Sequence, residues 1–521
     1  MAEQKEAEEK KLESPDKKIE ERKEKIKNWL KNSDNLLLIA LLVFAFVVLI
    51  YYFNITKNQP LWYDEAEYMS AANKWAFGIP YDIHKARPPL IAFLASLIFR
   101  LGLGLLSAKF ILELIPLFLS VLFIYLFVNE IYGNKKLALI TSFILSVSWI
   151  HLFYSMRMMT DALCFMFGIL ALLCLWKGYV NNKGNKYIWF IGPLVALAFL
   201  CRLTGILYGG FIVVFLLFTD KFKFLKNKHI WISLFITVLP IIPFLFWSYS
   251  YYGNPLAFFR AGYSGIPSIP LGWGMLQLVY DYPEFLFFIC FLIGALTLFP
   301  MLLSLDLIIF KKDKKFLPDF FVFLLLVFTI AFFIYFLRLA ENRWLMMMSI
   351  SIFILSAKGI VFVSEFIKKY FGKFLAVTAI VLLLVGGAYY ELKHADGIIK
   401  MKKDSYSQVR DAAIWMKENS NPDDIIVSAS HPQNTYYSER KTITSTDFFT
   451  GHYYTQEELD ARIKKIKPKY YVVSAFEPSV PQWTYTYPQN NSMFKPVKIW
   501  FADAEQKQPI LIVYEISYNN P

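Results

Sequence analysis

Long apolar segments constrain the fold of this chain more than any other feature of its sequence. They recur along the chain at lengths that suit membrane-spanning helices and carry few charges. We predict eleven spans, at residues 35–54, 107–129, 136–153, 158–177, 187–201, 204–219, 230–251, 284–309, 318–337, 344–363 and 373–390. The shorter apolar segment 89–101 is predicted to be a re-entrant or interfacial helix. Because 56% of the 521 residues are hydrophobic, the composition is not that of an ordinary soluble protein.

The distribution of positive charge predicts how the chain is oriented. The net charge of +13 comes largely from Lys clusters in short loops between the apolar segments. Cytoplasmic loops of membrane proteins are enriched in Lys and Arg. A cytoplasmic amino terminus puts every such cluster inside, leaves single Arg residues in the outer loops, and places the region after residue 390 outside. We therefore predict a multi-pass cell-membrane protein that contacts membrane lipid, and the pattern argues against a nucleic-acid partner.

Three regions are predicted along the chain. Residues 1–33 form a charged cytoplasmic extension, residues 34–390 the membrane domain, and residues 391–521 a small extracytoplasmic α/β domain. The last region is expected to contain helices at 406–420 and 455–466 and strands at 425–428, 470–474, 497–501 and 510–516. The fold class is thus an α-helical polytopic membrane protein with a small α/β domain. The four Cys residues lie at irregular spacing and indicate neither a disulfide framework nor a zinc site.

The first predicted outer loop carries three carboxylates within four residues. Asp64, Glu65 and Glu67 lie between the aromatic residues Tyr63 and Tyr68. Ionisable side chains near a membrane are costly and usually functional. Two adjacent carboxylates in different environments can serve as a base and as an orienting group. The alternative is a solvated loop whose acids cap a helix, which the spacing alone does not exclude.

A basic group follows the acidic one. His84 and Arg87 precede Pro88 and Pro89, which fix the chain direction before the short apolar helix. Arginine binds phosphate in a bidentate manner, so Arg87 suits a lipid phosphate at the interface. The alternative is an arginine that extends to the membrane surface for its own hydration.

Further charged residues fall on the same predicted side. Arg157 and Asp161 follow the third span, Arg202 lies between two spans, and Glu341 and Arg343 join two late spans. Guanidinium groups that converge on one side of a membrane bundle would bind an anionic headgroup. Asp161 could instead be an acid at a helix start, which needs no function.

These motifs resemble the GT-C membrane glycosyltransferases, and within them the protein O-mannosyltransferase and aminoarabinose transferase branch. The segments that carry the resemblance are Tyr63–Tyr68, Arg87–Leu90, Arg157–Ala162 and Glu341–Leu345, and it covers about residues 35–390. The resemblance implies a sugar donor carried on a polyprenyl or dolichyl phosphate. It also implies an inverting transfer at the outer face of the membrane, without a nucleotide.

The resemblance also implies roles for particular residues. Asp64 would be the general base, with Glu65 beside it and Asp161 as the second acidic position. If the acceptor is itself a phosphate, Asp64 would position rather than deprotonate it. Arg87 and Arg343 match basic positions of the family, and the charge pattern adds further predicted contacts to the donor phosphate: His84, Arg157 and Arg202. The residues predicted to contact the sugar or acceptor are Tyr63, Glu67 and Glu341.

Other functions and ligands stay open at this stage. The acceptor is a glycan, a lipid or a protein, although the twin-Trp motif of oligosaccharyltransferases and the paired-hairpin repeats of eukaryotic protein mannosyltransferases are missing. No cofactor is predicted with certainty, and the carboxylates and His84 could bind a divalent metal weakly. One alternative is a transporter or flippase of lipid-linked sugars, which predicts helices broken near the midplane. Another is a non-catalytic assembly protein.

Overall fold

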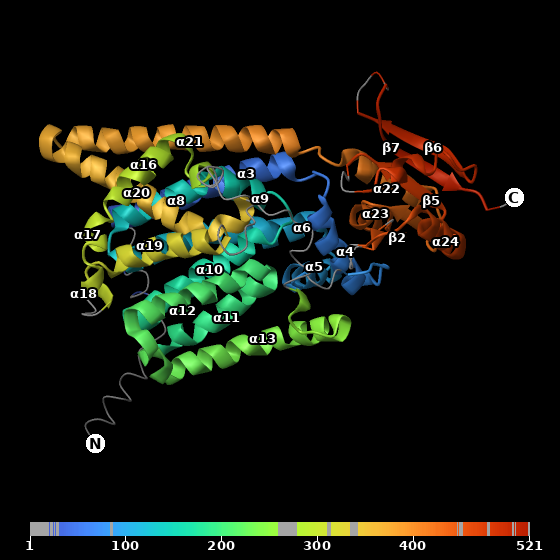
Figure 1. Cartoon of the computed structure of the whole chain (residues 1–521). Coiled ribbons are helices and arrows are strands. Elements are labelled where there is room, and N and C mark those ends of the chain that lie inside the picture. Colours follow the sequence, from blue (N-terminus) through green and yellow to red (C-terminus); the bar gives the residue numbers. More distant parts are fainter. Residues whose placement is uncertain are drawn as a thin grey trace.

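The computed structural model shows a bundle of helices joined at one end to a small α/β unit (Figure 1). It describes residues 31–83, 87–258, 279–309, 314–333, 342–444, 446–447, 452–476, 480–502 and 507–518, together with a few isolated positions.

The bundle is built from apolar helices of unequal length. In chain order they are α3 (Ser33–Thr56), α4 (Tyr63–Phe77), α5 (Leu90–Arg100), α6 (Leu105–Lys109), η1 (Phe110–Leu114), α7 (Ile115–Tyr132), α8 (Lys135–Val147), α9 (Trp149–Ser155), α10 (Asp161–Leu175), η2 (Trp176–Val180), α11 (Asn185–Cys201), η3 (Leu203–Gly205), α12 (Ile206–Asp220), η4 (Lys221–Lys226), α13 (Lys228–Tyr252), α16 (Glu284–Leu296), α17 (Phe299–Leu302), α18 (Leu305–Ile309), α19 (Leu317–Ile330), η6 (Asn342–Leu345), α20 (Met346–Phe371) and α21 (Lys373–Lys402). The elements η1 and η2 are π-helical turns, and η3, η4 and η6 are 3-10 turns.

The chain is a multi-pass membrane protein. Within the described residues, eight helices are long and apolar enough to cross a membrane, or nine if the bent pair α8 and α9 counts as one span. The predicted spans 187–201 and 318–337 coincide with shorter apolar helices, Asn185–Cys201 and Leu317–Phe333. The predicted interfacial segment 89–101 is α5. Each predicted span overlaps apolar helical structure in the described residues, but at most nine of the predicted eleven are long and apolar enough to cross a membrane there.

Two predicted spans differ from continuous helices. Residues 136–153 form α8 and α9, which meet at an angle of 52°. Ser148 at the junction has a non-helical ψ of 119°, and the backbone N–H of Trp149 donates to Glu391 Oε2 at 2.9 Å. That carboxylate on α21 supplies the acceptor that the broken helix lacks. Residues 284–309 are divided into α16, α17 and α18.

Close helix contact holds the late part of the bundle together. A Cβ atom on Gly294 of α16 would lie 1.8 Å from the carbonyl oxygen of Leu355, and one on Gly359 of α20 would lie 1.9 Å from that of Cys290. Small residues at helix contacts in membranes allow backbones to approach this closely. The contact fixes α20, which begins directly after the turn η6 that carries Arg343.

The α/β unit follows α21, which continues past residue 390 to Lys402. Its strands are β1 (Ile425–Ser428), β2 (Lys441–Ile443), β5 (Tyr470–Ser474), β6 (Phe494–Phe501) and β7 (Pro509–Ile516), in the order β2-β1-β5-β7-β6. The pairs β1–β2 and β1–β5 are parallel, and β7 is antiparallel to β5 and β6. A separate pair is formed by β3 (Thr446–Asp447) and β4 (His452–Tyr453).

Four helices complete the unit: α22 (Ser407–Glu418), α23 (His431–Ser438), α24 (Gln456–Ile466) and α25 (Trp483–Thr486). The predicted strands and the two predicted helices are present, whereas α23 lies in a segment for which the sequence predicts no element. α23 packs against α4 of the bundle, so the unit contacts the helix that carries the acidic motif (Figure 1).

Candidate functional site

The acidic motif lies on the first turns of α4. The helix begins after the extended residue Trp62, whose backbone N–H donates to Glu65 Oε2 at 2.6 Å, and it ends at Gly78 in the left-handed conformation with a φ of 78°. Residues three apart share one face of a helix, whereas neighbours are rotated by about 100°. Asp64 and Glu67 therefore lie on one face and Glu65 on another.

Asp64 joins two arginines from distant parts of the chain. Its Oδ1 accepts from Arg87 at 2.6 Å, and its Oδ2 accepts from Arg343 at 3.0 Å. Arg87 comes from the turn before α5 and Arg343 from η6. Burial alone would raise the pKa of Asp64, but the two guanidinium groups outweigh it and hold that pKa well below its usual range. The side chain keeps 23% exposure, so the cluster is reachable from outside the bundle.

Glu67 lies one helical turn further along the same face. It forms an ion pair with Arg87 Nε, so Arg87 lies between two carboxylates. Apart from this contact with Arg87, neither carboxylate oxygen of Glu67 has a hydrogen-bond partner among the described residues. Burial raises the pKa of Glu67 to about 7, with Arg87 opposing and Asp64 adding to the rise.

A small cavity adjoins this pair. It measures about 20 Å3 and is lined by Glu67, Arg87 and mostly apolar or aromatic side chains, including Trp75, Pro89 and Trp247. A cavity of this size holds about one water molecule. A larger groove of about 1030 Å3 lies at the other end of α4, against the α/β unit, and none of the predicted site residues lines it.

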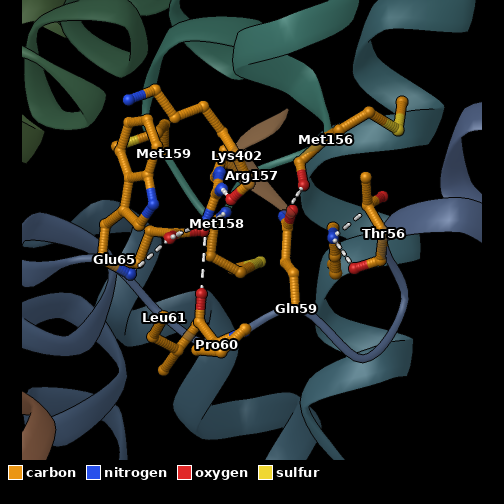
Figure 2. A network of polar contacts seen from close by, with 12 residues as sticks. Thr56, Gln59, Pro60, Leu61, Glu65, Met156, Arg157, Met158, Met159 and Lys402 are labelled. Atoms are coloured by element: carbon orange, nitrogen blue, oxygen red, sulfur yellow. Dashed lines mark hydrogen bonds and ion pairs between the residues drawn. The ribbon is translucent and has the colours of Figure 1, made fainter. Parts of the chain in front are cut away.

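Glu65 has a different environment from its neighbour Asp64. Its Oε1 accepts from the backbone N–H of Met158 at 2.5 Å, and its Oε2 lies 3.4 Å from Arg157 (Figure 2). Arg157 also donates to the carbonyl oxygens of Pro60 at 3.2 Å and Lys402 at 2.6 Å (Figure 2). Its guanidinium carbon lies 3.9 Å from the ring of Trp62. Both charged groups are buried and anchored to backbone atoms.

Asp161 and Arg202 form a second ion pair. Asp161 is the first residue of α10, and Arg202 lies at the carboxyl end of α11. The ring of Tyr68 lies 5.5 Å from the Arg87 guanidinium. Burial raises the pKa of Tyr68, and the charges of Arg87, Asp64 and Arg202 act on the same hydroxyl. Tyr68 thus connects the two clusters electrostatically.

The remaining predicted residues are placed as follows. The Tyr63 hydroxyl lies 3.2 Å from His431 Nδ1. His84 and Glu341 lie outside the described residues. In the part of the chain that the structure describes, no group of three His, Cys, Asp or Glu side chains could hold a metal ion.

The sequence does not single out two residues that the structure places beside the site. His431 begins α23, pairs with Tyr63 and stacks on Tyr81 at 5.9 Å. The sequence feature that could have pointed to His431 is a His-Pro pair directly after a predicted strand, since functional groups often lie at the carboxyl ends of parallel strands. Lys109 is buried and donates to the carbonyl oxygen of Thr56 at 2.9 Å. The sequence feature that could have pointed to Lys109 is its position as an ionisable residue inside a predicted membrane span.

A family model matches part of the helical bundle. The model for dolichyl-phosphate-mannose-protein mannosyltransferase matches residues 86–247, a segment that contains Arg87, Asp161 and Arg202. An uncharacterized protein from Aquifex aeolicus (strain VF5) is 28% identical over 199 residues, which are 36% of this chain and 40% of that protein. The match therefore spans less than half the length of this curated relative.

Solved structures match nearly the whole chain at low identity. ArnT from Cupriavidus metallidurans in the apo state has a TM-score of 0.64 and 14% identity, covering 91% of this chain and 97% of that chain. The same protein bound to undecaprenyl phosphate has a TM-score of 0.60, again at 14% identity and with the same coverage. The archaeal oligosaccharyltransferase AglB from Archaeoglobus fulgidus, in complex with an inhibitory peptide and a dolichol-phosphate, has a TM-score of 0.60 and 14% identity, covering 95% of this chain and 75% of that chain.

The fold is therefore that of the GT-C membrane glycosyltransferases, and the resemblance predicted from the sequence is confirmed.

Proposed function

We propose that this protein is a glycosyltransferase that takes a sugar from a polyprenyl- or dolichyl-phosphate donor and transfers it to an acceptor at the predicted outer face. The observation that carries the proposal is the convergence of Arg87 and Arg343 on one partly exposed carboxylate, Asp64. Two guanidinium groups held this close form a site for a phosphate. The GT-C fold and the matched family model support this assignment.

The donor phosphate replaces Asp64 as the partner of the two arginines. A guanidinium group presents a planar fork of donors that fits phosphate oxygens in a bidentate manner. As the bond between the sugar and the phosphate breaks, negative charge grows on the departing phosphate, and Arg87 and Arg343 stabilise it. Asp64 holds both side chains in position before the donor binds.

An apolar path for the lipid tail begins next to the phosphate site. α5 starts three residues after Arg87 and exposes Phe93 and Leu97, followed by Leu101 at its end. These side chains are 50%, 40% and 76% exposed. A prenyl chain held against this surface would bring its phosphate to the amino-terminal end of α5, where Arg87 lies. We assign α5 to the donor tail.

The other predicted residues take different roles in this proposal. Glu65 and Arg157 are anchored to backbone atoms, so we assign them a structural role in place of the predicted catalytic and phosphate contacts. Asp161 and Arg202 form a second charged pair near Tyr68 and are assigned to the sugar or acceptor side. The general-base role of Asp64, the inversion and the identity of the acceptor stay predictions.

The test is a turnover assay on the purified full chain in lipid nanodiscs. Radiolabelled hexoses and pentoses linked to undecaprenyl phosphate serve as donors, with water, glycerol and a membrane lipid extract as acceptors. We expect the wild type to release sugar from a lipid donor and Arg87→Gln to be slower by about 100-fold or more, since an oriented charge contact is worth several kcal/mol. Arg462→Gln, on the surface helix α24, is the matched control and should keep wild-type turnover.

Two results would contradict the proposal. Wild-type protein that moves no sugar from any lipid donor would remove the transferase assignment. Movement of the labelled lipid between leaflets without sugar transfer would favour the flippase alternative.

A further inference from the structure

The two carboxylates on the functional face of α4 are not equally able to accept a proton. Each oxygen of Asp64 accepts from a guanidinium group, at 2.6 Å from Arg87 and 3.0 Å from Arg343. Before the donor binds, both guanidinium groups favour the ionised form of Asp64 and oppose its protonation. Because these two arginines are the proposed phosphate ligands, Asp64 is the counter-charge that keeps them in place until the donor arrives.

Glu67 is arranged differently around the same arginine. Its Oε2 forms the ion pair with Arg87 Nε, and apart from this contact neither of its oxygens has a hydrogen-bond partner among the described residues. Its side chain is 2% exposed, yet it lines the cavity that also reaches Arg87. A buried carboxylate oxygen without a hydrogen bond is costly, and a proton or a water molecule in the cavity would relieve that cost.

We propose that Glu67, rather than Asp64, receives the proton of the acceptor hydroxyl during glycosyl transfer. This inference rests on the proposed function and concerns an acceptor that reacts through a hydroxyl group. Glu67 takes the proton directly or through one water molecule, for which the cavity has room.

The step balances in atoms and charge. The acceptor O–H bond breaks, its oxygen bonds to the anomeric carbon, and the bond from that carbon to the phosphate oxygen breaks with its electron pair left on the phosphate. The donor phosphodiester has one negative charge and the departing phosphomonoester gains a second. Glu67 loses one negative charge at the same moment. The site therefore keeps its net charge, which avoids placing an additional charge in a poorly solvated region.

Arg87 lies next to both groups whose charge changes, Glu67 and the donor phosphate. It contacts both Glu67 and Asp64, and it is the proposed ligand of the phosphate. When Glu67 becomes neutral, Arg87 loses one competing anion as the phosphate becomes more negative. Its interaction with the phosphate therefore strengthens in the transition state, and such differential binding lowers the barrier.

The surroundings agree with a carboxylate that can change its charge near neutral pH. Burial raises the pKa of Glu67 to about 7. Of the described groups that face it, Asp64 and Tyr68 come from α4, and Tyr81 and Arg87 come from the segment before α5. The neighbouring helices α5 and α13 contribute Ala92 and Trp247, which do not titrate.

The experiment compares the pH dependence of kcat for the wild type, Glu67→Gln and Asp64→Asn in lipid nanodiscs. The probe is the lipid-linked sugar that the wild type turns over, with glycerol or water as the acceptor. Glu67→Gln should lower kcat by about 100-fold to 10,000-fold, the usual range for a lost general base. Glu67→Gln should also remove the fall in kcat at low pH, which is the acid limb of the pH profile. It should keep the wild-type affinity for undecaprenyl phosphate. In Glu67→Ala, added formate should restore part of the rate.

The Asp64 variant separates the two assignments. If Glu67 accepts the proton, Asp64→Asn retains an acid limb, shifted to lower pH because the Asp64 charge helps to raise the pKa of Glu67. If Asp64→Asn removes the limb while Glu67→Gln keeps it at wild-type rate, the inference is wrong and the proposed function stands. Wild-type protein without any turnover overturns both. Equal thermal unfolding of the variants shows that a lower rate is not caused by misfolding.

Discussion

Asp64 and Glu65 are adjacent in the sequence, and each contacts arginine, yet their surroundings differ in kind. Asp64 is 23% exposed, and among the described residues it is held by two side chains, Arg87 and Arg343. Glu65 is 1% exposed and is held by the backbone N–H groups of Trp62 and Met158 as well as by Arg157. Side-chain contacts can be exchanged for a ligand without disturbing the fold, whereas backbone contacts cannot.

The comparison shows how one helix can carry both a reactive face and a structural one. Successive residues of α4 point about 100° apart, so one carboxylate faces the site and the next faces the junction with α9, α10 and α21. Arg157 joins that junction through the carbonyl oxygens of Pro60 and Lys402. We therefore propose that Glu65 fixes the position of the helix face that carries Asp64 and Glu67.

The largest expected effect comes from breaking the buried pair. Arg157→Met leaves the Glu65 carboxylate buried without its counter-ion, and the loss of one partner of such a pair costs about 3–5 kcal/mol. We expect a clear fall in the apparent midpoint of thermal unfolding in detergent, or loss of folded protein. The double variant Arg157→Met with Glu65→Gln should recover part of the stability. Unfolding equal to that of the wild type would show that the pair is not structural.

The next largest effect is the difference in thermal stability between variants of the two neighbouring carboxylates. Glu65→Gln should destabilise the protein by about 1–3 kcal/mol, because its amide cannot accept from every donor now paired with the carboxylate. Asp64→Asn should change thermal stability by less than about 1 kcal/mol, since Arg87 keeps its ion pair with Glu67 and both arginines are partly exposed. Parallel thermal unfolding of both variants checks this, and the opposite order would reverse the two roles.

A smaller effect is expected when kcat is measured as a function of pH. Because the pKa of Glu67 is raised to about 7, its ionised form dominates above that value and is lost below it. If the ionised form is required, kcat is constant above about pH 8 and falls about tenfold for each pH unit below 7. A pH series of kcat under saturating donor measures this. A flat profile between pH 5 and 8 would exclude Glu67 as the titrating group.

The smallest effect is expected from the contact between α23 and α4. His431→Phe keeps an aromatic ring beside Tyr81 but removes the polar contact with Tyr63. A lost hydrogen bond of this kind costs about 0.5–1.5 kcal/mol of stability, so thermal unfolding should begin at a slightly lower temperature than in the wild type. Burial lowers the pKa of His431 to about 4, so the ring is neutral at neutral pH. His431→Phe should therefore leave the pH profile above pH 5 unchanged.

Most of the fold could be predicted from local sequence, because apolar length identifies membrane helices and local composition identifies the strands. The break between α8 and α9 could not. Ser148 is an ordinary residue in an apolar run, and the acceptor for the next N–H, Glu391, is 242 residues away. The helix α23 was also missed, because its polar residues form no apolar periodicity and become buried only against α4.

The candidate site was predictable in composition but not in pairing. Asp64 and Arg87 stand out because they lie beside an apolar span, and the structure brings them together at 2.6 Å. The partnership with Arg343 spans 279 residues and depends on the packing of α20. The different surroundings of Asp64 and Glu65 follow from helix rotation and from distant backbone atoms, which no local pattern records.

We propose that the donor phosphate takes the place of Asp64 between Arg87 and Arg343. The decisive measurement is the affinity of the wild type, Asp64→Asn and Arg87→Gln for undecaprenyl phosphate. Asp64→Asn should bind the lipid phosphate as tightly as the wild type or more tightly, because a competing anion is gone, and Arg87→Gln should bind it more weakly. Lost binding in Asp64→Asn together with wild-type binding in Arg87→Gln would show that the phosphate does not replace Asp64.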